Sequence, residues 1–173
     1  MAPRRTSLRA GFSLLELVIA LTLVSIVASL AIPFYFERSV ITLENAAVQL
    51  CRDLRAAQNR AAYLGITATV EFREDGTGYE VLGEGRTPLP GPHGSPEFVR
   101  EYTRDGVFEG VRILDLELNS DQRRIRYGPQ GTAVEGGTIT IEFQGDTRTV
   151  SVRRGNGLLA ILDSSSGWLD DGL

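Results

Sequence analysis

Apolar and polar positions divide the chain into three parts. Residues 12–32 are almost wholly apolar and hold a single charged side chain, Glu16. Beyond Pro33, apolar residues recur at three- and four-residue spacing as far as Leu64, which predicts an amphipathic helix. From residue 66 the spacing falls to two, which is typical of strands. The sequence therefore predicts an α+β fold, in which a long N-terminal helix packs on a C-terminal antiparallel β-sheet domain.

The predicted amphipathic helix carries one apolar stripe, and its charged residues lie mostly off that stripe. Gly65 is a natural helix terminator. A coiled coil is the alternative explanation for such a stripe. The many alanines of this stripe and the strands that follow it favour packing of the helix against a sheet. The stripe consists of Phe36, Val40, Leu43, Ala47, Leu50, Leu54, Ala57, Ala61 and Leu64, and the charged residues off it are Glu37, Glu44, Arg52, Asp53, Arg55 and Arg60.

Alternating residues and turn formers predict the strands of the C-terminal part. Gly76 and Gly78 bracket one turn, and Gly145 with Asp146 forms the turn of a hairpin. Residues 83–96 are rich in glycine and proline and predict an irregular surface loop. The expected strands are 66–72, 79–82, 113–118, 124–127, 139–143, 150–152 and 158–162, the last of which closes the sheet.

The N-terminal apolar run has the length of a membrane span. Residues 12–32 would form a helix of about 31 Å, close to the hydrocarbon thickness of a bilayer. A secretory signal peptide is the alternative, but its apolar part is shorter and ends in a small-residue cleavage site, whereas Gly11 precedes this run. Arg4, Arg5 and Arg9 hold the N-terminus in the cytoplasm, so the residues after Pro33 lie outside the inner membrane.

Charge is distributed unevenly along the 173 residues, although the net charge is only −4. Residues 1–11 carry +3, residues 12–65 are neutral, and residues 66–173 carry −7. A general nucleic-acid-binding protein needs clustered cations to displace phosphate counterions, so the acidic C-terminal part disfavours that class. With 42% hydrophobic residues, the chain has enough apolar material for a core.

Few residues offer chemistry for catalysis or metal binding. The only histidine, His93, falls in the irregular loop, and the only cysteine, Cys51, lies beside the apolar stripe as a small core residue. No nucleophile, phosphate or dinucleotide motif is present. The tail acids Asp163, Asp170 and Asp171 lack the alternating ligands of a calcium loop. We therefore expect no catalytic residue, cofactor or metal, and a protein that is not an enzyme.

Glu16 is the anomaly of the apolar run, because a carboxylate in hydrocarbon is costly unless it has a partner or a function. The residues Gly11-Phe12-Ser13-Leu14-Leu15-Glu16 resemble the prepilin processing motif of type IV pilins and type II secretion pseudopilins. Pro33 falls where many members of that family place a helix-weakening proline, so we expect a helix break there. A plain membrane anchor with a snorkelling Glu16 is the simpler alternative.

The resemblance implies a processing step and an assembly role. A prepilin peptidase would cut between Gly11 and Phe12 and methylate the new amino group of Phe12. In a filament, that amino group would meet Glu16 of a neighbouring subunit, and their pairing in an apolar core would fix the axial register.

The C-terminal part is similar to the GspH/FimT group of minor pseudopilins and pilins. The similarity rests on residues 54–58 ahead of a strand, 127–131, 137–141, 150–152 and Gly155. It implies a pilin-like fold in five parts. These are a prepilin leader (1–11), a transmembrane and filament-core helix (12–33), an amphipathic helix (34–65), a periplasmic β-rich domain (66–163) and a poorly ordered tail (164–173) with Trp168 as a candidate anchor.

The resemblance favours a minor pseudopilin of a type II secretion system, a subunit of the periplasmic pseudopilus that helps export folded proteins. Its partners would be the prepilin peptidase, the other major and minor pseudopilins and the inner-membrane assembly platform. One alternative is a FimT-like minor pilin that primes a type IV pilus, with DNA uptake as one role. Another is a membrane-anchored periplasmic domain of unrelated function, such as an enzyme.

DNA binding is disfavoured, because the only arginine clusters are Arg123, Arg124 and Arg126, and Arg153 with Arg154.

Overall fold

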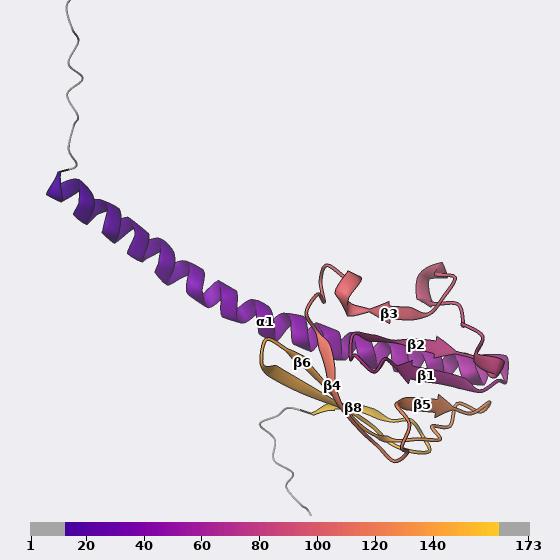
Figure 1. Ribbon diagram of the computed structural model, residues 1–173. Coiled ribbons are helices and arrows are strands. Elements are labelled where there is room, and N and C mark those ends of the chain that lie inside the picture. Colours follow the sequence, from indigo (N-terminus) through magenta and orange to yellow (C-terminus); the bar gives the residue numbers. More distant parts are fainter. Residues whose placement is uncertain (1–12, 163–173) are drawn as a thin grey trace, which may run out of the picture. The chain divides into compact units, whose positions relative to one another are not determined.

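The chain divides into two compact units, Met1–Arg38 and Ser39–Leu173. This computed structural model describes residues 13–162, and of residues 30–40 and His93 it describes the backbone only. Gly11, Phe12 and the tail 164–173 therefore lie outside the described residues. One long helix, α1 (Leu14–Leu64), begins in the first unit and ends in the second (Figure 1).

The start of α1 is fixed by a serine cap. The amide of Glu16 donates to Ser13 Oγ at 3.1 Å, and the amide of Leu17 donates to the Ser13 carbonyl at 3.2 Å. Ser13 and Glu16 have the spacing of a capping box, and an acidic residue in the first turn also suits the positive end of the helix dipole. Residues at the start of the apolar run thus favour a helix beginning at Leu14.

The structure corrects the prediction of a helix break at Pro33. α1 is helical on both sides of Pro33 and through it. Proline removes one main-chain hydrogen bond but has a helical φ, so it weakens a helix without having to end it. Judged on the described residues, no helix combines the length and the apolar character that a membrane crossing requires.

The second unit contains two four-stranded antiparallel sheets where the sequence suggested one. The first sheet has the order β3-β2-β1-β5 and the second β4-β6-β7-β8. The β6–β7 hairpin turns at Gln144 and Gly145, with Phe143 paired to Asp146, close to the predicted turn. The strands are β1 (Ala68–Phe72), β2 (Gly78–Leu82), β3 (Val99–Glu101), β4 (Arg112–Leu118), β5 (Arg124–Tyr127), β6 (Gly137–Phe143), β7 (Asp146–Val152) and β8 (Leu159–Leu162).

The sequence located seven of these strands and missed β3. β3 has one apolar residue, Val99, and no alternation to reveal it. It pairs with β2 through the register Tyr79↔Arg100, which is a tertiary contact. The predicted loop 83–96 holds two short 3₁₀ helices, η1 (Glu84–Arg86) and η2 (Pro92–Gly94), and a third, η3 (Tyr102–Arg104), follows β3.

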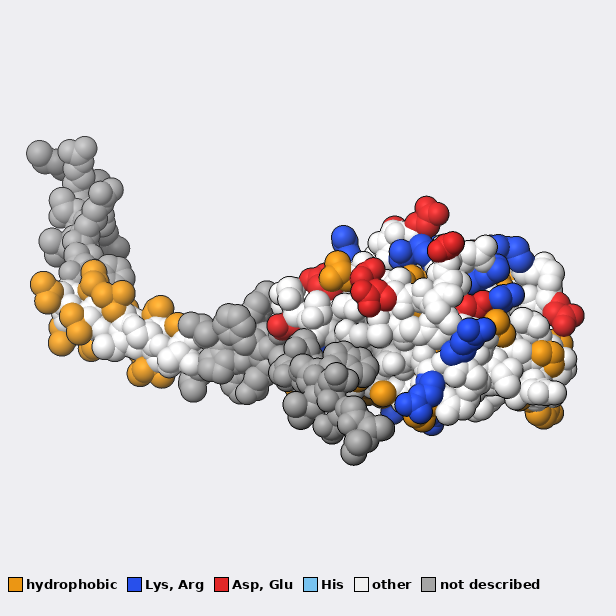
Figure 2. Space-filling model, turned by 90° about the horizontal axis from the view of Figure 1, so that it is seen from below, with side chains coloured by type: hydrophobic (Ala, Val, Ile, Leu, Met, Phe, Trp, Pro, Cys, Tyr) orange, Lys and Arg blue, Asp and Glu red, His pale blue; other side chains and the backbone are white. Residues whose placement is uncertain are grey.

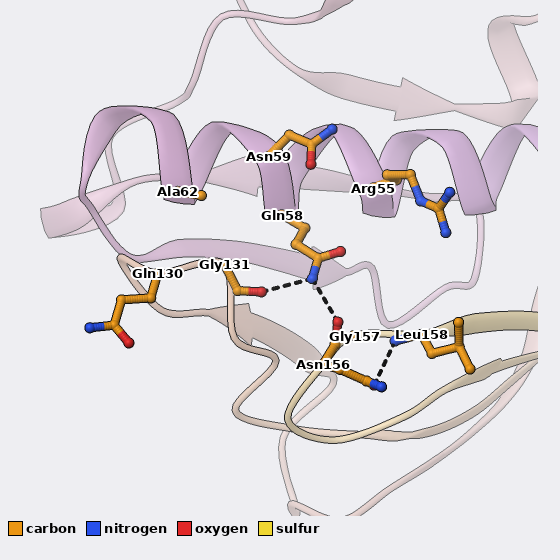
Figure 3. A pocket seen from close by; sticks show the side chains of 9 residues that line it. All are labelled: Arg55, Gln58, Asn59, Ala62, Gln130, Gly131, Asn156, Gly157 and Leu158. Carbon is orange, nitrogen blue, oxygen red and sulfur yellow. Dashed lines mark hydrogen bonds between the residues drawn. The ribbon is translucent and has the colours of Figure 1, made fainter.

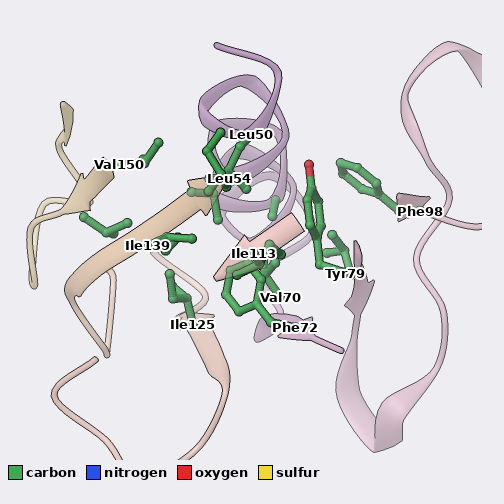
Figure 4. Packing of buried hydrophobic residues seen from close by; sticks show 14 of the residues in the cluster. Leu50, Leu54, Val70, Phe72, Tyr79, Phe98, Ile113, Ile125, Ile139 and Val150 are labelled. Carbon is green, nitrogen blue, oxygen red and sulfur yellow. The ribbon is translucent and has the colours of Figure 1, made fainter. Parts of the chain in front are cut away.

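The core lies between α1 and the two sheets (Figure 4). Leu50 and Leu54 of α1 meet Val70 of β1 and Ile139 of β6, and each of these side chains is at most 1% exposed. Burying a leucine or valine side chain stabilises a fold by about 1.5–3 kcal/mol. The predicted stripe is confirmed from Leu43 to Ala61, whereas Leu64 at the helix end is 49% exposed.

Gly76 joins the two sheets. It sits in the β1–β2 turn at φ +71°, and its carbonyl accepts the amide of Ile113 in β4 at 2.8 Å. A Cβ at this position would collide with the Ile113 carbonyl oxygen. The turn therefore needs glycine both for its backbone conformation and for the close approach of β4.

Candidate assembly surfaces

The described N-terminal part of α1 presents an apolar surface. Glu16 is its only charged side chain between residues 13 and 29, and it is exposed. Figure 2 shows apolar side chains gathered on this part of the helix, whereas charged side chains are scattered over the second unit. The apolar side chains, between 48% and 84% exposed, are Leu14, Leu15, Leu17, Val18, Ile19, Leu21, Leu23, Val24, Ile26 and Val27.

The hydroxyls of this segment are satisfied by the helix itself. Thr22 Oγ1 donates to the Ile19 carbonyl at 2.8 Å, and Ser25 Oγ donates to the Leu21 carbonyl at 2.9 Å. Ser29 Oγ does the same one turn later. Such back-bonding removes the need for water at these side chains, so the surface is compatible with an apolar environment on every side.

Asp53 lies in the core, although the sequence analysis placed it with the charged residues off the apolar stripe. It is 2% exposed and stands among the buried residues Leu50 and Ala57. Its Oδ2 accepts the Tyr79 hydroxyl at 2.7 Å and the Nε and Nη2 of Arg100, both at 3.1 Å. Its Oδ1 accepts the side-chain amide of Gln49 at 2.9 Å. A buried carboxylate with four donors is well compensated.

This cluster holds the β2–β3 segment against α1. Burial, together with the neighbouring Tyr102 and Asp53, raises the pKa of Tyr79, so its phenol stays protonated and donates. Arg100 also reaches Asp105 at 3.8 Å. Asp53 and Arg100, the buried and half-buried charges of this cluster, both have partners. The cluster therefore has a structural role, which is to hold the β2–β3 segment on α1.

A second buried carboxylate, Glu135, covers the outer edge of β5. Its Oε2 accepts the amide of Arg126 at 2.8 Å, and its Oε1 accepts Arg126 Nε at 2.7 Å. The neighbouring Val134 amide donates to the Arg126 carbonyl at 2.8 Å. No sequence signal singles out Glu135, because the contact depends on the loop between β5 and β6 folding back onto β5.

A shallow groove of ≈ 320 Å³ lies where α1 meets the loops that follow β5 and β7 (Figure 3). Gln58 forms its floor, because its Nε2 donates to the Gly131 carbonyl at 2.7 Å and to the Asn156 carbonyl at 3.0 Å. Arg55 extends from α1 toward the side that Leu158 occupies. The hydrogen bonds of Gln58 thus fix the shape of the groove, and Arg55 gives one side of it a positive charge.

The remaining candidate residues offer little chemistry. Cys51 is half-buried, and burial raises the pKa of its thiol, an effect that Arg55 partly offsets. A raised thiol pKa lowers reactivity, which suits a packing role. In the part of the chain that the structure describes, no group of three or more His, Cys, Asp or Glu side chains could hold a metal ion. His93 belongs to η2.

Comparison with known proteins gives matches in both parts of the chain. Residues 6–32 match the prokaryotic N-terminal methylation motif, and residues 46–156 match the family described as type II transport protein GspH. Among solved structures, the type IV minor pilin FimU of Pseudomonas aeruginosa is 20% identical. That alignment covers 72% of this chain and 90% of FimU, at a TM-score of 0.49. No curated protein matches the chain.

Proposed function

We propose that this chain, which belongs to the GspH family of type II transport proteins and carries the prokaryotic N-terminal methylation motif, is a minor pseudopilin of a type II secretion system. In this role it is a non-catalytic subunit of a periplasmic filament that helps export folded proteins. Its partners are the other pseudopilins, the prepilin peptidase and the inner-membrane assembly platform.

The observation that carries the proposal is the exposed apolar surface between Leu14 and Val27. A surface of this kind requires a cover, because contiguous apolar area in water marks an interaction site. Lipid covers it before assembly, and the same helices of neighbouring subunits cover it in a filament. The internal bonds of Thr22 and Ser25 support both environments, since neither hydroxyl then needs water.

Processing gives Glu16 its partner. Cleavage between Gly11 and Phe12 creates a new amino group four positions before Glu16. The hydroxyl of Ser13 accepts the main-chain amide of Glu16 and does not engage its carboxylate, which remains available for a neighbouring subunit. Arg4, Arg5 and Arg9 hold the leader in the cytoplasm, where the prepilin peptidase acts.

The processing experiment tests whether the chain is made into a filament subunit. We expect mass spectrometry of the protein from its own cells to find a chain that begins at N-methylated Phe12. Gly11→Val should accumulate the unprocessed form, because the cleavage site must admit the backbone closely there. An intact leader in cells with active prepilin peptidase would overturn the proposal.

A gene deletion separates secretion from piliation. We expect loss of exoprotein secretion with surface pili retained, and restoration of secretion by the wild-type chain. Loss of pili with secretion retained would instead assign the chain to a type IV pilus. A third result, with both processes intact, would contradict a filament role in either machine.

A further inference from the structure

Three of the four outer strands of the two sheets are protected against pairing with another chain. β3 has only three residues, and two of them, Arg100 and Glu101, are charged. β5 is covered by the loop that contains Glu135. β4 has a bulge between Ile113 and Asp115 and carries further charged residues. Short length, cover, charge and bulges are the usual devices that prevent edge-to-edge association.

β8, which has four residues, carries no charge and no bulge. The residues 158–162 read Leu-Leu-Ala-Ile-Leu, without a charge or a proline. Its pairing with β7 runs in regular register from Val152↔Leu159 to Thr149↔Leu162, so there is no bulge. Within residues 13–162, no strand pairs with its other edge. An open edge of this composition is a template for an incoming strand.

The hydrogen-bonding groups of that edge can be assigned from the register. The amide of Arg153 donates to the Leu158 carbonyl at 2.9 Å. Because inward and outward groups alternate along an antiparallel strand, Ala160 and Leu162 bond to β7. The amides and carbonyls of Leu159 and Ile161 therefore point away from β7, toward the open edge.

The side chains of the same two residues are also incompletely covered. Leu159 and Ile161 are paired with the buried Val152 and Val150, so they lie on the face of the sheet that packs on the core. Both are only half-buried. An added strand with apolar residues at alternate positions would complete this face.

The groove described above adjoins the start of β8, and its charge indicates what the strand should carry. Leu158 lines the groove opposite Arg55 (Figure 3). Arg55 is exposed, and among the described residues it has no acidic partner. An uncompensated cation in a groove beside an open edge complements a carboxylate, which a guanidinium binds in bidentate fashion.

We propose that the outer edge of β8 and the adjoining groove form a docking site for an extended segment of another protein chain. The segment adds as a strand to Leu159 and Ile161 and sets a carboxylate against Arg55. Main-chain bonds supply affinity in this mode of recognition, while the side-chain contacts supply specificity. The site requires neither cleavage of the leader nor membership of a particular secretion machine.

Site-specific crosslinking of the full chain in its own membranes tests the docking site. A photoreactive p-benzoylphenylalanine replaces the exposed Ala160 on β8, and the same group in place of the exposed Leu114 on β4 is the control. We expect an adduct from position 160 only. Mass spectrometry of the adduct should map it to an extended segment of a different protein, with an Asp, a Glu or a terminal carboxylate near the attachment point.

Charge reversal then tests the groove. Arg55→Glu should lower the yield of this adduct about tenfold, the effect of losing roughly 1.4 kcal/mol of binding free energy. Arg52→Glu is the matched control, since Arg52 is exposed on the same helix but does not line the groove, and it should leave the yield unchanged. Equal thermal unfolding of both variants shows that neither change disturbs the fold.

Four results would overturn the proposal. The first is an adduct yield at position 160 no higher than at position 114. The second is an adduct confined to residues 163–173 of the same chain, and the third is one that joins two copies of this chain. The fourth is an adduct to another protein that persists unchanged in Arg55→Glu.

Discussion

Asp53 shows how a single carboxylate can belong to an apolar helix face. Its side chain is surrounded by core residues, yet all four of its hydrogen bonds are to donors on Gln49, Tyr79 and Arg100. Three of these four donors, one on Tyr79 and two on Arg100, come from β2 and β3, so the carboxylate links α1 to the first sheet. The side chain of Arg100 is 24% exposed, which reduces what the ion pair costs in desolvation.

Replacing this carboxylate should destabilise the fold. Asp53→Asn removes the charge that compensates Arg100 and gives the Tyr79 hydroxyl a weaker acceptor, so we expect the free energy of unfolding to fall by about 2–3 kcal/mol. Urea unfolding followed by circular dichroism measures the loss. Asp105→Asn is the matched control, because Asp105 contacts the outer side of Arg100 at 3.8 Å and should cost less than about 1 kcal/mol. Equal losses for the two variants would contradict the role of Asp53.

At the scale of elements, the periodicity of the sequence predicted the helix and most strands. It did not predict the features that depend on contacts between residues far apart in the sequence. Alternation located β1, β6 and β7, and helical spacing located the buried stripe of α1, because both follow from one buried face. The burial of Asp53 was not predicted, although Leu50 and Ala57 place position 53 on the same face, because its partners come from β2 and β3. The division into two sheets depends on strand pairing, which periodicity does not encode.

The buried face of α1 supplies a test of the packing. Leu54 is fully buried, so Leu54→Asp would place an unpaired carboxylate in the core and lower the free energy of unfolding by about 4 kcal/mol or more. Tyr63→Asp on the same helix is the control, since Tyr63 is 89% exposed and should change stability by about 0.5 kcal/mol or less. A Leu54→Asp chain that unfolds at the wild-type urea concentration would refute the packing of α1 on the sheets.

At the scale of the whole molecule, the two units have opposite surface properties. The second unit closes a core of its own between α1 and two sheets and exposes mostly polar side chains. The described part of the first unit buries none of its side chains and exposes mostly apolar ones. The second unit thus has the core of an independent fold, whereas the described part of the first unit has the exposed apolar surface of an interaction site.

Glu16 separates insertion in the membrane from assembly. Glu16→Leu makes the apolar run more apolar, so the chain should still be inserted and cleaved. In a filament, however, the amino group of Phe12 on a neighbouring subunit would be left without its partner, a loss of roughly 3–5 kcal/mol. We therefore expect normal amounts of processed protein in the inner membrane but little in sheared filaments, measured by immunoblotting of both fractions.

Glu16→Gln distinguishes the charge of the side chain from its size and polarity. Glutamine has nearly the size and shape of glutamate, and the main-chain amide at position 16 still donates to Ser13 Oγ, so this variant removes the charge and keeps the start of α1. If Glu16 acts through its charge, Glu16→Gln should assemble as poorly as Glu16→Leu. Normal assembly of Glu16→Gln alone would assign the role of Glu16 to the size and polarity of its side chain, and normal assembly of both variants would show that Glu16 has no part in the register. Failed insertion of either variant would place the role of Glu16 before assembly, at the insertion step itself.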